Sequence, residues 1–218
     1  MNEDTLQKIL DEVEYLYEGY SNTRRATTQP HLWKVFYDNF PDIDIHPDND
    51  VVRETLIEHS GSLPIMAIAL YPYIQDDSVN LGDSLTMMAF HDIGELITGD
   101  EMTFTKNPED GEAELEAGLK LLDPMFHEMY KDAETKTSQS AKFAKAIDKI
   151  NPDILDYLTP KDVTIWRYKK YTGLEKPEEI IALIKKHKRP YMEWNPFLTK
   201  FHDHLMTQLK KKLSGTSL

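Results

Sequence analysis

The segment FHDIGELITGD, residues 90–100, sets one imidazole and three carboxylates among apolar, helix-forming residues. Burying a lone carboxylate is costly, or forces the group to take up a proton. Imidazoles and carboxylates that surround a divalent cation avoid this cost. On a helix, Glu95 lies one turn after His91 and Asp92 and faces the same side. The segment therefore predicts a metal site, with Glu95 placed to orient or deprotonate water.

Two other segments carry polar residues where a helix core would prefer apolar ones. One is Glu58-His59-Ser60, and the other is AKAIDKI, residues 144–150, in which Asp148 lies between isoleucines. Two histidines and two aspartates suit Mn²⁺, Co²⁺, Fe²⁺ or Zn²⁺, and suit Mg²⁺ less well. We interpret one set of residues as the ligands of a single divalent metal ion: His59, His91, Asp92 and Asp148.

This ligand pattern resembles the metal-binding pattern of the HD-domain superfamily of phosphohydrolases. The flanking segments are similar to its 5′-deoxynucleotidase-like branch, and they are RETLIEHS (53–60), HDIGELITGD (91–100) and ETKTSQSAKFAKAIDK (134–149). The resemblance covers about residues 53–150. It implies an all-α orthogonal helical bundle, often dimeric, that removes phosphate from nucleoside 5′-monophosphates.

The resemblance also assigns roles to residues. It implies that His59, His91, Asp92 and Asp148 bind the metal, that Glu95 is the general acid/base, and that Asp100 completes the acidic pocket around water and phosphate. An arginine before the EHS segment usually meets the phosphate in that branch, and the candidates are Arg24, Arg25 and Arg53.

The stretch from Arg24 to Gly61 departs from the pattern of that branch. Gly61 follows the EHS segment, where a bulky residue is common, and the N-terminal arginines lack the usual aromatic residue after them. These positions lie where base and sugar should bind. We therefore expect the base and sugar selectivity to differ from that of the branch.

Composition restricts the function classes. The formal net charge is −13 over 218 residues, which repels nucleic-acid backbone and anionic lipid. There is no cysteine, which rules out disulfides and thiolate metal sites. No apolar run is long enough to span a membrane, and the N-terminus does not read as a targeting signal. We expect a cytoplasmic homodimer that acts on a small-molecule nucleotide and binds neither nucleic acid nor membrane.

Hydrophobic periodicity predicts helices almost throughout one domain, residues 1–218. Its motif core spans 53–150, and a C-terminal helical extension spans 160–213. We expect an irregular connection over 21–50, with a short helix around Trp33–Phe40, and no strands. The predicted helices cover 2–20, 51–74 with a kink or division at Pro64, 81–97, 109–131 with a break at Pro124, 138–157, 177–187 and 196–213.

Two alternatives remain open. Another HD enzyme would act on nucleoside triphosphates, cyclic dinucleotides or an alarmone, and would need a deeper pocket. A non-catalytic HD module would keep the metal only for stability, and would not need Glu95 and Asp100 beside the ligands.

A second HD dipeptide, His202-Asp203, lies near the C-terminus without the GE…GD context. It has no partner aspartate downstream. We interpret residues 202–204 as a solvated helix face.

Overall fold

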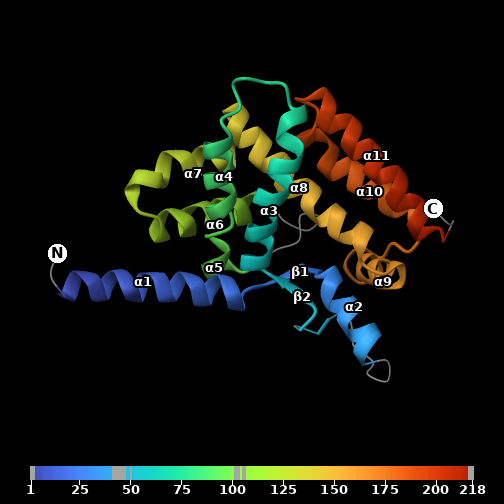
Figure 1. Cartoon of the computed structure of the whole chain (residues 1–218), viewed down its shortest axis with the longest axis horizontal. Coiled ribbons are helices and arrows are strands. Elements are labelled where there is room, and N and C mark those ends of the chain that lie inside the picture. Colours follow the sequence, from blue (N-terminus) through green and yellow to red (C-terminus); the bar gives the residue numbers. More distant parts are fainter. Residues whose placement is uncertain (1–2, 41–47, 50, 101–103, 105–106, 216–218) are drawn as a thin grey trace.

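The helix α8 (Gln139–Leu158) lies at the centre of the molecule (Figure 1). Ser138 caps it by accepting the backbone N–H of Ala141, as serine commonly does at this position. Phe143, Ile147 and Ile150 recur at helical spacing along α8 and are fully buried. The core therefore forms around α8, which packs against α3 (Leu56–Leu70), α4 (Leu81–Phe90), α7 (His127–Thr135) and α11 (Pro196–Leu213).

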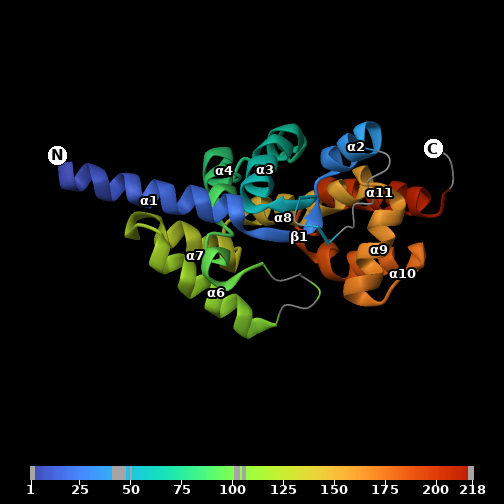
Figure 2. The ribbon, with the colours of Figure 1, turned by 90° about the horizontal axis from the view of Figure 1, so that it is seen from below.

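The computed structural model describes residues 3–40, 48–49, 51–100, 104 and 107–215. Its other elements are α1 (Glu3–Asn22), β1 (Arg24–Thr28), α2 (Pro30–Asn39), β2 (Arg53–Thr55), η1 (Tyr71–Tyr73), α5 (Glu95–Thr98), α6 (Pro108–Leu121), η2 (Pro124–Phe126), α9 (Lys161–Thr172), α10 (Pro177–Lys188) and η3 (Arg189–Tyr191). Figures 1 and 2 show helices that run in different directions around α8, with α1 extending beyond the helical body. The predicted all-α orthogonal bundle is confirmed.

The start of α3 differs from the prediction of a helix from residue 51. Residues 53–55 form β2, which pairs antiparallel with β1. Thr55 then caps α3, because its hydroxyl accepts the N–H of Glu58 while the Glu58 carboxylate accepts the N–H of Thr55. The helix continues through Pro64 without division, so of the predicted kink or division at Pro64 the division is excluded.

The connection over 21–50 is more regular than expected in its described part. β1 is a strand only because residues 53–55 pair with it, and no local alternation of apolar and polar residues marks it. The expected short helix is α2, which starts earlier, at Pro30. Residues 41–47 and 50 lie outside the described residues.

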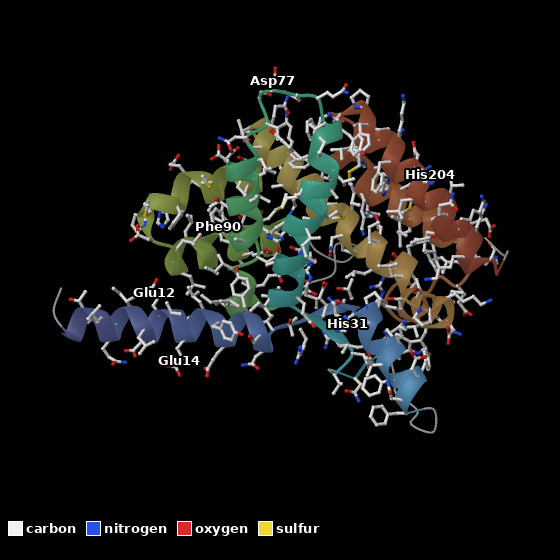
Figure 3. The ribbon with its side chains drawn as sticks, viewed as in Figure 1. Glu12, Glu14, His31, Asp77, Phe90 and His204 are labelled. Atoms are coloured by element: carbon white, nitrogen blue, oxygen red, sulfur yellow. The ribbon has the colours of Figure 1, made fainter. Side chains whose placement is uncertain are left out.

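The predicted helix over 81–97 is divided at the HD dipeptide. α4 ends at Phe90, which points into the helical body (Figure 3) and packs edge-on against Tyr130. Residues 91–94 form a turn in which the N–H of Ile93 and that of Glu95 each bond a carbonyl three residues back. α5 follows and ends at Gly99, whose φ of 78° agrees with the predicted end of the helix.

In the C-terminal half, α9 lies inside the predicted helical extension 160–213, although its own bounds were not predicted. The segment 109–131 divides into α6, η2 and α7 around Pro124, as expected. The bounds of α9 escaped detection because half of its buried face is polar. Arg167 and Tyr168 on that face both bond the buried carboxylate of Asp156 on α8.

The interpretation of residues 202–204 as a solvated face was wrong for His202. His202 is fully buried, and its Nε2 lies 3.2 Å from a carboxylate oxygen of Asp153 on α8. Lys188 of α10 donates to the other oxygen of Asp153. Asp203 does pair at the surface with Lys185, and His204 is exposed on α11 (Figure 3). The His202 side chain therefore belongs to a buried ion cluster that joins α8, α10 and α11.

No helix among the described residues is both long and apolar enough to cross a membrane.

The turn at 91–94 packs closely against the backbone of α6, and this contact predicts the effect of a substitution at Gly94. A Cβ added at Gly94 would lie 2.2 Å from the backbone oxygen of Glu114 on α6. Gly94→Ala should therefore lower the free energy of unfolding by about 1–3 kcal/mol, because a backbone segment must move. Urea unfolding monitored by circular dichroism measures this change.

Gly61→Ala in α3 is the matched control, because an added Cβ there meets nothing within 4 Å. Alanine is favoured over glycine in a helix by about 1 kcal/mol, and so this variant should be at least as stable as the parent. Equal effects of the two substitutions would show that α6 does not hold the turn.

Candidate metal centre

Four side chains from three segments meet at one buried point. α3 supplies His59, the turn after α4 supplies His91 and Asp92, and α8 supplies Asp148. The Nε2 atom of His59 lies 3.3 Å from Asp148 Oδ1 and 3.5 Å from Asp92 Oδ2. The Nε2 atom of His91 lies 3.6 Å from Asp148 Oδ1 and 3.0 Å from Asp92 Oδ1. The fold thus brings together the residues that sequence analysis had grouped.

A chain of hydrogen bonds fixes the orientation of the His59 ring. Ser62 Oγ donates to the carbonyl of His59, and Asn151 Nδ2 donates to Ser62 Oγ. The amide oxygen of Asn151 is therefore the atom that faces His59 Nδ1, at 3.2 Å. Since that oxygen only accepts, Nδ1 must carry the hydrogen. The lone pair of Nε2 then points to the shared centre.

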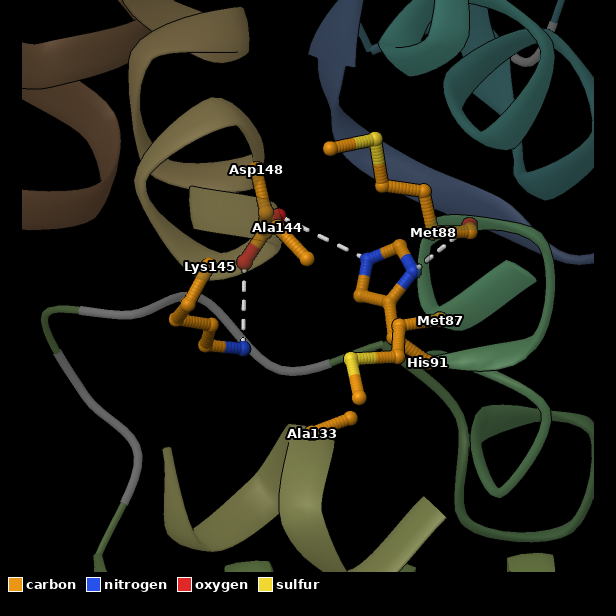
Figure 4. Close-up of a pocket in the computed structure, with 7 residues that line it drawn as sticks. All are labelled: Met87, Met88, His91, Ala133, Ala144, Lys145 and Asp148. Atoms are coloured by element: carbon orange, nitrogen blue, oxygen red, sulfur yellow. Dashed lines mark hydrogen bonds and ion pairs between the residues drawn. The ribbon is translucent and has the colours of Figure 1, made fainter. Parts of the chain in front are cut away.

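The His91 ring is held in the same manner by a backbone carbonyl. Its Nδ1 lies 3.0 Å from the carbonyl oxygen of Met88, which only accepts (Figure 4). Nδ1 is therefore the donor, and Nε2 presents its lone pair toward Asp148. A cavity of about 10 Å³ borders His91, Lys145 and Asp148 and is otherwise lined by Met87, Met88, Ala133 and Ala144. This is roughly the space of one water molecule or one ion.

The charges at this point favour a cation. Burial opposes ionisation of Asp148, but the ammonium groups of Lys145 and Lys149 outweigh it and hold the pKa of Asp148 well below its usual range. Burial also opposes ionisation of Asp92, but His91 and Arg25 outweigh it and lower its pKa. Burial lowers the pKa of His91, yet the two aspartates raise it to about 10. The aspartates thus favour a positive charge between them, which a proton or a divalent cation can supply.

The donor set fits a divalent metal ion. Ligand atoms about 2.0–2.2 Å from one ion lie roughly 3–3.5 Å from each other, close to the separations around this point. Among the described residues, neither histidine Nε2 has a hydrogen-bond partner of good geometry, although both are buried. Two imidazole lone pairs and two anionic carboxylates therefore share one point, as in many sites for transition metals.

Glu95 and Asp100 lie on the other side of Asp92. Glu95 is buried, and burial together with the charge of Asp92 raises its pKa well above the usual value. Asp100 accepts the backbone N–H of Ala26 at 3.0 Å and so ties the end of α5 to β1. A second group of potential ligands, Asp92, Glu95 and Glu114, contains no histidine. The other group, His59, His91 and Asp148, contains both imidazoles, and Asp92 approaches these imidazoles at 3.5 and 3.0 Å, so these four residues form the better ligand set.

The three candidate arginines have different positions. The guanidinium of Arg25 reaches the carboxylates of Asp92, Glu95 and Asp100, and its Nε lies 3.6 Å from Glu54. Arg53 instead donates to the backbone carbonyls of Arg24 and Arg25 and so supports the strand β1. Arg25 is therefore the arginine beside the candidate metal ligands.

Sequence analysis missed several residues of this site. Lys145 and Lys149 contact Asp148 Oδ2 at 3.1 and 3.2 Å, and Asn151 orients His59. Lys145, Lys149 and Asn151 lie three residues before, one after and three after Asp148 on the same helix. This spacing could have identified them from the sequence. Glu54 gave no such signal, because its burial depends on the pairing of β2 with β1. It accepts hydrogen bonds from Thr27 and Gln29.

Comparison with known families agrees with this geometry. Residues 45–177, more than half of the chain, match the family model described as "HD domain". The chain belongs to the HD-domain family. The matched range of this HD domain includes all four candidate ligands: His59, His91, Asp92 and Asp148. Its place in the 5′-deoxynucleotidase-like branch stays a prediction.

A solved structure supports the same fold. The crystal structure of a protein titled "predicted metal-dependent phosphohydrolase", from Magnetospirillum magnetotacticum MS-1, is similar to this HD-domain chain with a TM-score of 0.63. The match covers 95% of this chain and 96% of that chain, at 19% sequence identity. No curated protein matches the chain.

The two HD dipeptides provide an internal test of the metal centre. Asp92→Asn should remove most of the bound metal, because even an outer-shell partner is typically worth ~10–100-fold in metal affinity. Asp203→Asn should keep the metal, because Asp203 pairs only with Lys185 and Arg189 at the surface of α11. Elemental analysis of both purified variants, with melting before and after chelation, measures the difference. Equal metal content in the two variants would contradict the assignment.

Proposed function

We propose that this HD-domain protein is a metal-dependent phosphohydrolase that releases phosphate from nucleoside 5′-monophosphates. The observation that carries the proposal is the position of Arg25 and Glu95 beside the four clustered ligand-type residues. Family membership and the similarity to the Magnetospirillum protein, described as a predicted metal-dependent phosphohydrolase, support the hydrolase class. The similarity of residues 53–60, 91–100 and 134–149 to the deoxynucleotidase-like branch supports the substrate.

One divalent ion would be held by His59, His91, Asp92 and Asp148, with Mn²⁺, Co²⁺, Fe²⁺, Zn²⁺ and Mg²⁺ as the candidates. When bound, it would act as a Lewis acid on a phosphoryl oxygen and on the attacking water. Lys145 and Lys149 keep Asp148 anionic for this role. Asn151 and the Met88 carbonyl keep the two imidazole rings aligned.

Glu95 is placed to move the protons of the reaction. Hydrolysis forms a bond between phosphorus and the oxygen of water, and breaks the bond between phosphorus and the ester oxygen. Water gives up protons, and the leaving alkoxide takes one. The Glu95 carboxyl is buried beside Asp92. It can therefore hold a proton near both oxygens, as a general acid/base does.

Arg25 supplies the positive charge that a phosphate needs in an acidic protein. Its guanidinium is planar and always charged, which suits bidentate contact with phosphate. Arg53 acts on Arg25 through the backbone of β1, because it donates to the Arg25 carbonyl. Asp100 accepts the N–H of Ala26 and also lies 3.8 Å from the Arg25 guanidinium. We therefore assign Arg25 to phosphate contact and give Asp100 and Arg53 positioning roles.

Both alternatives remain open beside this proposal. A hydrolase of triphosphates, cyclic dinucleotides or an alarmone would use the same metal centre with a larger pocket. A non-catalytic module would use the metal for stability only. The buried position of Glu95 and the partly buried position of Arg25 favour an enzyme, because burial of charged groups is costly unless they have a function.

Glu95→Gln should keep the metal and lose turnover. The substitution preserves size but replaces the ionisable carboxyl with an amide that cannot act as an acid or base. General acid/base groups typically contribute ~10²–10⁴-fold to the rate. Phosphate release by the metal-loaded variant measures kcat. Glu116→Gln, an exposed change on α6, is the matched control and should retain full activity. Full activity in Glu95→Gln would remove Glu95 from the mechanism.

A substrate panel tests the reaction class. Ribo- and deoxynucleoside mono-, di- and triphosphates and a cyclic dinucleotide should rank with a 5′-monophosphate first in kcat/KM. Arg25→Ala should raise KM for that substrate by about 10–100-fold, the size of a charge-assisted contact. Arg24→Ala should give a smaller change. A triphosphate or a phosphodiester ranked above every monophosphate would favour the first alternative.

A homodimer remains part of the proposal, together with a cytoplasmic location, a single domain over 1–218, and no nucleic-acid or membrane partner. The first turns of α1 carry an exposed apolar stripe that offers a surface for a second copy: Leu6 53%, Leu10 57%, Val13 56% and Tyr17 65% exposed. Sedimentation velocity of the parent and of Leu10→Glu tests this. A monomeric parent would exclude the homodimer.

A further inference from the structure

We propose that a second pocket, beside the metal centre, binds a second anionic group of the substrate, and that the favoured substrates are phosphomonoesters that carry another phosphate. We call this the lysine pocket. It is lined by Lys136, Lys142, Lys145, Pro190, Tyr191 and Trp194. The proposal rests on the proposed phosphohydrolase function and extends it to the substrate.

The lysine pocket is large enough for a substituent. Its volume is about 180 Å³, whereas the cavity that borders His91 and Asp148 has about 10 Å³. A single water needs only about 10–15 Å³ by this kind of measure. The lysine pocket therefore has room for a phosphate group, whereas the small cavity beside His91 does not.

Its lining is cationic in a chain of net charge −13. Lys136 follows α7, while Lys142 and Lys145 lie one turn apart on α8. None of its described lining residues is a carboxylate. The Lys145 ammonium pairs with Asp148, and the ammonium groups of Lys136 and Lys142 add positive charge that attracts an anion to the pocket.

The opposite wall is aromatic. The ammonium groups of Lys136 and Lys149 lie 5.9 and 6.0 Å from the ring centroid of Tyr191. This wall comes from η3 and the residues after it. Trp194 completes this wall, and its fluorescence therefore reports on the pocket.

Lys145 connects the two sites. It lines both the small cavity beside His91 and the lysine pocket. Its ammonium lies 3.1 Å from Asp148 Oδ2, and Figure 4 shows it reaching that carboxylate beside His91. A substrate whose scissile phosphate lies at the metal centre therefore has a second group within reach of the lysine pocket. This continuity makes the pocket a subsite for the substrate rather than a remote effector site.

Binding of inorganic pyrophosphate to the intact protein tests the pocket without any need for turnover. Pyrophosphate should change the tryptophan fluorescence at constant ionic strength, and the change should be absent in Trp194→Phe. Lys142→Gln should weaken binding by about tenfold, the size of one charge-assisted hydrogen bond at a half-buried site. Lys131→Gln is the control, because Lys131 is exposed on α7 and pairs with Glu128.

Kinetics then links the pocket to the substrate. A nucleoside 3′,5′-bisphosphate should have a KM at least about fivefold below that of the matching 5′-monophosphate, and Lys142→Gln should remove most of this difference. Equal pyrophosphate affinity in Lys142→Gln and Lys131→Gln would overturn the proposal, since binding would then occur elsewhere. So would equal KM values for the two nucleotides. Pyrophosphate binding that depends on Lys142, in a protein that hydrolyses no nucleotide, would reject the proposed substrate and keep the pocket.

Discussion

Asp92 and Asp148 are buried at one point, and their negative charge has to be compensated there. Two carboxylates this close in a low-dielectric interior cannot both remain ionised without positive partners. The fold provides them on separate sides: Arg25 beside Asp92, and Lys145 and Lys149 beside Asp148. Between the carboxylates lie the Nε2 atoms of His59 and His91. These lone pairs and carboxylate oxygens would together hold a divalent cation, which would link α3, the turn after α4, and α8.

The same charges divide the surroundings of the centre into two functional sides. Toward β1 lie Glu95 and Arg25, which suit proton transfer and phosphate contact. Toward η3, the lysine pocket begins at Lys145. An acidic protein that handles phosphate must reverse its field locally. Under the proposed function, cationic residues of β1 and α8 would provide this reversal in a chain of net charge −13.

A residue's role could be predicted from the sequence only where its environment is formed by residues close to it in the chain. The spacing of His91, Asp92 and Glu95, and the isoleucines around Asp148, marked residues that the structure then brought together. Lys145 and Asn151 were within reach, because they share one helix with Asp148. Glu54 and the β1–β2 pair were not, since a strand of five residues is defined by its partner. The burial of His202 and the bounds of α9 were not predicted for a related reason. Their polar side chains are buried against Asp153 and Asp156, and no local pattern in the sequence indicates this.

The central claim is that His59, His91, Asp92 and Asp148 bind one divalent ion. The most direct measurement is anomalous diffraction from crystals of the protein grown with Mn²⁺, recorded at the manganese absorption edge. The account predicts one strong peak, about 2.0–2.3 Å from Nε2 of both histidines and from an oxygen of each aspartate. A peak held instead by Asp92, Glu95 and Glu114 without histidine contact, or the absence of any peak, would contradict it.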